Sequence, residues 1–370
     1  MFILFLAVPT KPKRVDRVIL QNPPAMPLLL CAYIYCRVTG FFYRHRPCLI
    51  IDWHNLGYSM LASRSLQRLA RKYEEIMAPL ADGHLTVTAA MKDFLVKEMN
   101  VPVTSATTRV LHDCPPQMFH PLSLKEQHAI LMKLDAHLCM ACPMPWYASK
   151  DNDKQSLLTE CYGEDKYRVR RGRPALVTSS TSWTPDEDFG ILLSALVLLD
   201  ARIQREASTL QVLVVVTGKG PQKAFYEQKI TQLALIHVAV QTLWLEPADY
   251  PKLLACADLG VSLHTSTSGL DLPMKVLDLF GCEVPVCACN FACLSELVED
   301  CVNGRIFTKS NDLAEQLWDL LNPVATIKGA TPGCHAYGSL EKYSKQLQGR
   351  RRWNENWTEN ALPVILNTPY

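Results

Sequence analysis

The chain has 370 residues, of which 48% are hydrophobic and 20% are charged. This composition excludes general disorder and leaves enough length for two domains, each with its own core. The 38 lysines and arginines nearly balance 36 aspartates and glutamates, so net charge does not indicate a nucleic-acid binder. We therefore expect no nucleic acid among its partners.

Residues 1–16 form an atypical N-terminal segment. The apolar run Met1 to Pro9 is too short to span a bilayer and lacks the charged start of a secretory signal. The next apolar run, Met26 to Cys36, is stopped by Arg37. We therefore predict neither a transmembrane helix nor export.

The chain contains fourteen cysteines. Because no export signal is evident, we expect reduced thiols in the cytosol. The pair Cys139 and Cys142 and the group between Cys282 and Cys293 each lack a second ligand pair at zinc-finger spacing. We therefore predict no metal site.

Residues 17–122 alternate short β-branched runs with longer amphipathic ones, which is typical of βα units on a parallel sheet. A helix over 63–81 places Leu66, Leu69, Tyr73 and Ile76 on one face. Strands are predicted at 17–22, 48–54, 84–89 and 108–113, and a second helix at 90–99. Four strands are fewer than a complete doubly wound domain normally has, so we expect the domain over residues 17–122 to be incomplete.

Residues 123–173 connect the two halves. Three prolines within 114–121 favour an extended crossover, and a capped helix begins near Ser123. From Cys139 onward no hydrophobic period is sustained and turn residues are frequent, so a long surface insertion is predicted.

Residues 174–338 have the pattern of a complete doubly wound domain. Continuous apolar runs such as Val212 to Val216 indicate parallel strands that are covered on both faces. The six predicted strands are 175–180, 210–220, 237–244, 258–264, 284–290 and 304–308, with helices between them. In the remaining segment, 339–370, a helix over about 339–360 is expected to cross back onto the first domain.

The predicted strands of the second half end in polar loops, where an open parallel sheet binds its ligands. In "TGKGP", Gly218 and Gly220 permit close approach of a phosphate and Lys219 offers a charge. The alternative is a tight turn with Pro221 at the first helical position. In "DLPMKVLD", Lys275 and Asp278 share a helix face, and the alternative there is an ordinary surface ion pair.

The first half offers "IIDWHNLGYS" at a strand end. His54 titrates near neutrality and suits a general base, with Asp52 beside it in sequence. Trp53, Asn55 and Tyr58 complete a cluster that we expect on the acceptor side. The alternative is a structural histidine.

Several stretches together resemble the chitobiosyldiphosphodolichol β-mannosyltransferases. They are "LQNPP", "IDWHNLGYS", "SSTSWTPDEDF", "TGKGP", "LSELVEDCVNG" and, above all, the block from "WLEPADYPKLLACADLG" to "VPVCACNF". The resemblance implies a GT-B fold, in which two Rossmann-like doubly wound domains face a cleft. It also implies an inverting transfer of mannose from GDP-mannose to dolichol-diphosphate chitobiose, with no tightly bound cofactor and a divalent cation as a possible stimulant.

The resemblance also implies roles for individual residues. Asp278 would hold the ribose, matching the second acid of a pair seen in related retaining enzymes, and Asp271 the mannose hydroxyls. The general base would be His54 or Asp52. The other donor-side residues would be Lys275, Gly269 and Ser268 at the diphosphate, His264 capping the pocket, and Gly218, Lys219 and Ser182.

The family works on the cytosolic face of the endoplasmic reticulum membrane, in some cases beside later mannosyltransferases of the dolichol pathway. Its members begin with a membrane-spanning helix and a βαβ portion, and "MFILFLAVPTKPKRVD" stands in their place here. We therefore expect a shortened form with an uncovered sheet edge, held peripherally at the membrane. The alternative function is a catalytically silent relative that binds nucleotide-sugar or partner enzymes. We expect the apolar segment 27–47 to be a buried helix rather than a membrane contact.

Overall fold

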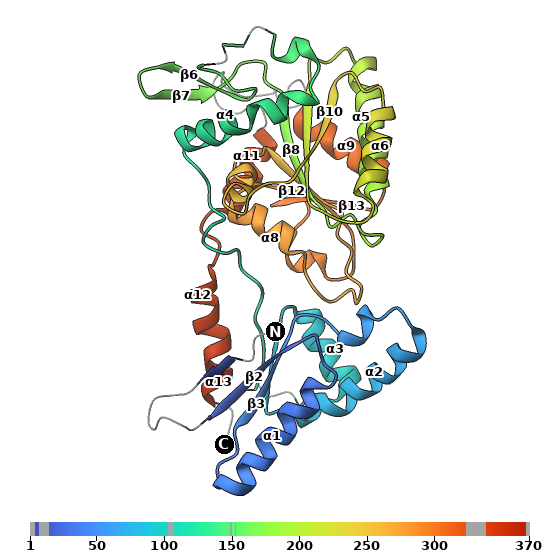
Figure 1. Ribbon diagram of the computed structural model, residues 1–370, viewed down its shortest axis with the longest axis vertical. Helices are drawn as coiled ribbons and strands as arrows, with labels where there is room; N and C mark the ends of the chain where they lie inside the picture. Colours follow the sequence, from blue (N-terminus) through green and yellow to red (C-terminus); the bar gives the residue numbers. More distant parts are fainter. Residues whose placement is uncertain are drawn as a thin grey trace.

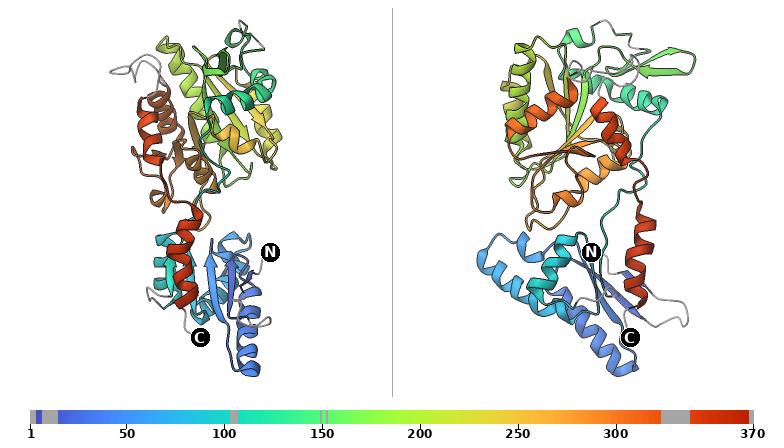
Figure 2. Two further views of the ribbon diagram at one scale, coloured as in Figure 1. Left: turned by 90° about the vertical axis from the view of Figure 1, so that its left-hand side faces the viewer. Right: turned by 180° about the vertical axis from the view of Figure 1, so that it is seen from behind.

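The computed structural model describes residues 4–6, 15–102, 107–148, 150–151, 153–322 and 338–367. Figure 1 shows two α/β lobes, one above the other, with the C-terminal helix running down beside the lower lobe. The side views in Figure 2 show the same two lobes with a narrow waist between them. Both lobes are Rossmann-like, as expected for the GT-B fold.

The lower lobe contains a five-stranded sheet in the order β1-β2-β3-β4-β5. Its strands are β1 Leu4–Leu6, β2 Arg17–Asn22, β3 Cys48–Trp53, β4 Gly83–Thr86 and β5 Thr108–Val110. Strands β2 to β5 are parallel, whereas β1 pairs with β2 in the antiparallel sense. Strand β1 pairs only with Arg17–Ile19 of the six-residue β2 and is itself the edge strand of the sheet.

The two faces of this sheet have different covers. Helices α1 Leu28–Tyr43, α2 Arg64–Met77 and α3 Ala89–Met99 belong to the side where Val18, Leu20 and Ile51 are buried. Ile19, Ile50 and Leu85 point to the opposite face and pack against Val364 and Ile365 of the C-terminal segment. The end of the chain therefore completes the core of the first domain.

The C-terminal segment is not one continuous helix over 339–360. Helix α11, Gly338–Leu347, ends before a break, and the chain resumes as α12 Trp353–Asn356, a π-helical turn Trp357–Ala361 and α13 Leu362–Asn367. The Arg17 Nε donates to the Ile365 carbonyl at 2.6 Å, and Arg109 Nη1 donates to the Glu359 carbonyl at 3.0 Å. These bonds anchor the π-helical turn and α13 to the first domain.

Helix α1 is largely exposed, contrary to the expectation for segment 27–47. Only Leu29 and Cys36 of this apolar helix are buried, and Phe41 is 82% exposed, so segment 27–47 is not a buried helix. Among the described residues, no helix has the length and hydrophobicity needed to cross a bilayer.

The upper lobe contains a fully parallel six-stranded sheet in the order β10-β9-β8-β11-β12-β13. Its strands are β8 Ala175–Ser180, β9 Val212–Thr217, β10 Val238–Leu243, β11 Leu259–Ser262, β12 Val286–Cys289 and β13 Gly304–Phe307. The order reverses between β8 and β11, which makes that point the expected ligand crevice of an open sheet.

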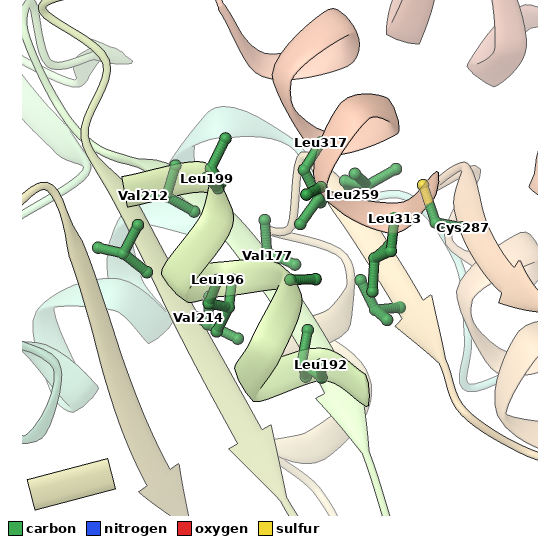
Figure 3. Close-up of a cluster of buried hydrophobic side chains, with 14 of the residues drawn as sticks. Val177, Leu192, Leu196, Leu199, Val212, Val214, Leu259, Cys287, Leu313 and Leu317 are labelled. Carbon is green, nitrogen blue, oxygen red and sulfur yellow. The ribbon is translucent and has the colours of Figure 1, made fainter. Parts of the chain in front are cut away.

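Helices cover both faces of the upper sheet. Helices α5 Phe189–Arg205, α6 Lys223–Gln232 and α9 Ser310–Leu321 cover one face. Figure 3 shows Leu192, Leu196 and Leu199 of α5 against Val212 and Val214 of β9. Alternate residues of the strands, Leu213 and Val215, point to the other face, which explains why the strands read as continuous apolar runs.

The connecting region is more integrated than a surface insertion. Helix α4, Leu124–Met140, begins with the predicted cap, because the Ser123 and Glu126 side chains each bond the other's backbone. The hairpin of β6 Thr159–Gly163 and β7 Lys166–Val169 follows. However, Trp146, Leu157 and Leu158 are buried with α4 against the upper sheet, so part of the segment belongs to its core.

Candidate active site

The loop between β11 and α8, Met274–Gly281, carries the first group of predicted donor residues. The Asp271 carboxylate accepts hydrogen bonds from the hydroxyls of Ser266 and Ser268, and it lies 3.6 Å from His264 Nε2. Burial alone would raise the pKa of Asp271, but the bonds from His264 and Ser266 outweigh it and the pKa is lowered. Asp271 is therefore an ionised acceptor at neutral pH.

Lys275 has a partner that the sequence did not reveal. In the first turn of α8, its ammonium contacts the carboxylate of Glu187, which is buried. Glu187 also accepts from the Thr181 hydroxyl at 2.8 Å and from the Ser182 backbone N–H at 2.6 Å. Lys275 therefore forms an ion pair with Glu187 and also lines a cavity of the upper lobe.

Asp278 lies one turn further along α8 and is mostly removed from water. No hydrogen bond or ion pair of its carboxylate is found within the described part of the chain. Desolvation raises the pKa of Asp278 to about 7. A half-buried carboxylate without a donor loses hydration that only a ligand or water can replace, so Asp278 is suited to accept hydroxyl groups.

A cavity of about 370 Å³ opens at the carboxyl ends of β8, β9 and β10. Its polar wall includes Ser182, Gly218, Lys219 and Lys275, and its apolar wall includes Trp244. The Lys219 ammonium lies 3.9 Å from the centroid of the Trp244 ring. Cationic and hydroxyl groups on one side and an aromatic face on the other suit a nucleoside diphosphate.

Asp278 lies close to this cavity. Tyr250, which lines the cavity, shares an electrostatic interaction with Asp278, and its hydroxyl lies 3.0 Å from Ser180 Oγ. The Lys275 ammonium therefore lines the cavity directly, whereas Asp278, three residues further along the same helix, is related to it through Tyr250.

The glycines of "TGKGP" are required by packing. Gly218 has a φ of +135°, and a Cβ added there would lie 1.8 Å from the Thr181 carbonyl oxygen. A Cβ on Gly220 would lie 1.7 Å from the Ser182 carbonyl oxygen. Both glycines therefore let this loop lie directly against the loop after β8 and close the cavity wall.

The second group of predicted residues lies at the end of β3. His54 Nε2 lies 3.0 Å from Asp52 Oδ2, and the His54 backbone N–H donates to the Asn22 carbonyl at 2.9 Å. Burial alone would lower the pKa of His54, but its hydrogen bond with Asp52 and the Asp52 charge outweigh burial, so the pKa is raised. This is the arrangement of a carboxylate-supported general base.

The two groups meet across the domains. Asn55 Nδ2 donates to Asp271 Oδ1 at 3.2 Å, which ties the loop of His54 to the loop of the predicted donor residues. Gly269, with a φ of +74°, turns that second loop toward the first domain. The Ser59 hydroxyl lies 3.3 Å from Thr267 Oγ1 as a further contact.

Trp53 does not belong to the acceptor surface. Its side chain is fully buried, and its indole N–H donates to His84 Nδ1 at 3.1 Å inside the first domain. The period of a strand explains the difference, because Asp52 and His54 point to one face and Trp53 to the other. Tyr58 remains partly exposed, with the Arg71 guanidinium 5.9 Å from its ring.

Two further acids were not predicted. Asp113 interacts electrostatically with His54, Asp52 and Asp271, and burial raises its pKa. Glu296, from the short helix η4 Leu294–Glu296, accepts from the backbone N–H groups of Ala89 and Ala90 at the start of α3, at 2.7 and 2.9 Å. Glu296 lies in the quoted stretch "LSELVEDCVNG" and Asp113 ends a predicted strand, but neither pattern indicates a contact between the domains, which only the folded structure shows.

The fold and this interdomain site define a GT-B glycosyltransferase. Residues 173–323 match the family model described as glycosyl transferases group 1. Solved structures share the fold at low identity. Anabaena HepE in complex with UDP superimposes with a TM-score of 0.60 at 16% identity over 92% of this chain and 76% of that one. A sucrose-phosphate synthase from Thermosynechococcus elongatus gives 0.56 at 13%, over 93% and 72%.

Relatives in other organisms define the family more narrowly. Chitobiosyldiphosphodolichol β-mannosyltransferases of Mus musculus and Homo sapiens are each 39% identical over 95% of this chain, covering 70% and 73% of their own lengths. The chain belongs to the chitobiosyldiphosphodolichol β-mannosyltransferase family. An Arabidopsis thaliana relative named UDP-glycosyltransferase TURAN is also 39% identical, over 99% of this chain and 78% of its own length.

Proposed function

We propose that this protein transfers mannose from GDP-mannose to dolichol-diphosphate chitobiose at the cytosolic face of the endoplasmic reticulum membrane. The names of its relatives support the reaction type and the acceptor. The observation that carries the donor assignment is the desolvated carboxylate of Asp278, which interacts with Tyr250 in the wall of the 370 Å³ cavity. It would accept hydrogen bonds from the ribose hydroxyls.

The reaction would be one inverting displacement. The acceptor hydroxyl oxygen bonds to the anomeric carbon of mannose while the bond from that carbon to the diphosphate breaks. The hydroxyl proton passes to His54, and Asp52 stabilises the imidazolium that forms. Lys275 and the N-terminus of α8 stabilise the charge left on the diphosphate.

The donor nucleotide has a competing candidate. The Arabidopsis relative carries a UDP-glycosyltransferase name, so a UDP-sugar is the second candidate donor. Measuring binding of GDP and UDP to the purified protein separates the two. We expect GDP to bind at least about tenfold more tightly; equal or tighter binding of UDP would contradict the GDP-mannose assignment.

A transfer assay tests the activity itself. Purified protein, GDP-mannose and a lipid-diphosphate chitobiose acceptor should yield a β-linked trisaccharide product. Absence of product together with tight GDP binding would identify a catalytically silent relative. Product formation from a non-lipid acceptor alone would contradict the proposed acceptor.

A further inference from the structure

Helix α2 turns its apolar face toward solvent. The side chains of Leu66, Leu69 and Ile76 are 54%, 60% and 56% exposed. They recur at helical spacing with Tyr73, whereas Ala70, Glu74 and Met77 form the buried side. An amphipathic helix normally buries its apolar stripe, so this outward stripe marks an interaction surface.

Helix α1 carries a second outward stripe. Leu30, Ile34 and Val38 are each about half exposed, and Phe41 and Phe42 at its end are 82% and 72% exposed. These side chains recur at three- and four-residue spacing, so they lie along one side of the helix.

Tyr73 joins the two stripes into one face. Its hydroxyl accepts from the Leu30 backbone N–H at 2.8 Å and donates to the Pro27 carbonyl at 3.2 Å. Tyr73 belongs to the stripe of α2, and Leu30 begins the stripe of α1. Figures 1 and 2 show both helices on the outside of the lower lobe, with α1 extending away from the upper lobe.

The charges around this two-helix face that have no ion-pair partner in the described part of the chain are cationic, whereas Glu75 and Glu98 are paired with Arg71. The stretch from Met26 to Ile51 contains no acidic residue. Of its arginines, Arg37 lies over the Tyr33 ring at 4.9 Å and Arg44 lines a groove of about 490 Å³ beside Phe41. Within the described part of the chain neither has an acidic partner, and the same holds for Arg64 and Arg68 at the start of α2.

We infer that the two-helix face of α1 and α2 docks on a bilayer surface that contains anionic phospholipid. Apolar and aromatic side chains bordered by arginines without acids match the headgroup and acyl boundary of a bilayer. This inference rests on the proposed function, because a lipid-linked acceptor must be reached from a membrane.

The position of the face relative to the site supports this role. The turn η1, Gly57–Met60, directly follows the loop of His54 and leads into α2. Met60 and Leu61 in this connection are exposed as well. Docking through α2 would therefore hold the loop of the candidate base close to the lipid surface from which the acceptor diphosphate projects.

Vesicle co-sedimentation of the full chain tests the inference without any measurement of activity. Phosphatidylcholine vesicles that contain phosphatidylserine should bind the protein more than phosphatidylcholine alone, and binding should weaken in high salt. Leu66→Gln/Leu69→Gln and Phe41→Ser/Phe42→Ser should each weaken binding at least about fivefold, and Arg37→Gln/Arg44→Gln should remove the preference for anionic vesicles.

Ile236→Gln is the matched control, since Ile236 is 57% exposed on the upper lobe. It should bind vesicles like the unaltered protein, and GDP binding should be preserved in every variant as evidence of folding. Unchanged vesicle binding in the face variants, or an unaltered protein that is a dimer and becomes monomeric in them, would overturn the inference. Neither result would affect transfer to a detergent-solubilised acceptor, so the proposed function is tested separately.

Discussion

At the scale of single residues, the pair of His54 and Asp52 gives the activity a defined pH dependence. A general base must be neutral to accept a proton, and the pKa of His54 is raised above its ordinary value of 6.5. We expect log kcat to rise with pH below that pKa and to level off above it. A pH profile of the transfer reaction measures this directly.

Substitution of Asp52 identifies the titrating group. Asp52→Asn removes the charge that raises the pKa of His54, so burial dominates and the acidic limb should move to lower pH, with kcat on the plateau reduced about tenfold or more. If the acidic limb stays in place, another group, such as Asp113, is the base.

Asp278 is expected to lower the stability of the folded protein. Its pKa is about 7 in the fold and near 3.8 in the unfolded chain, so the folded state holds an extra proton between those values. The free energy of unfolding therefore falls as pH rises from about 4 to about 7. Asp278→Asn should stabilise the protein by on the order of 1–2 kcal/mol more at pH 8 than at pH 5, measurable by urea denaturation. A loss of stability at pH 8 would contradict this account.

At the scale of elements, the two loops that form the cavity wall depend on glycine. Gly218→Ala places a methyl group on the Thr181 carbonyl and imposes an unfavourable backbone angle. We expect a loss of about 2–4 kcal/mol in the free energy of unfolding or a displaced loop with at least about tenfold weaker GDP binding. Gly172→Ala is the control, because Gly172 also has a positive φ but nothing lies within 4 Å of its added Cβ. Equal effects of both substitutions would refute the packing argument.

The elements of the upper domain were predictable because each strand is apolar on both faces and ends in a polar loop. The same reasoning located Lys275 and Asp278 on one helix. It did not locate Glu187, because an acid in "TPDEDF" looks like an ordinary helix start and its contact with Lys275 joins residues 88 apart. Strand alternation could have assigned Trp53 to the core. The outward faces of α1 and α2 were not predictable, since apolar periodicity identifies an apolar face of a helix but does not show whether the protein buries that face.

At the scale of the whole molecule, Glu296 links the two domains. Its carboxylate bonds two backbone N–H groups at the start of α3, and His112 Nε2 lies 3.1 Å away. Glu296→Ala removes bonds that hold the two domains together and leaves the cavity of the upper domain intact. We expect kcat to fall about tenfold and small-angle scattering to show a larger radius of gyration, while GDP binding changes by less than about twofold. A large loss of GDP binding would show that Glu296 acts on the donor site instead.

The proposed transfer requires that the cavity of the upper domain bind a guanine nucleotide with the help of Asp278. Calorimetric titration of GDP into the unaltered protein, Asp278→Asn and Asp319→Asn tests this most directly, since Asp319 is an exposed acid on α9 far along the chain. We predict that Asp278→Asn weakens GDP binding by at least about tenfold while remaining folded, and that Asp319→Asn binds normally. Unchanged GDP affinity in Asp278→Asn would contradict the account.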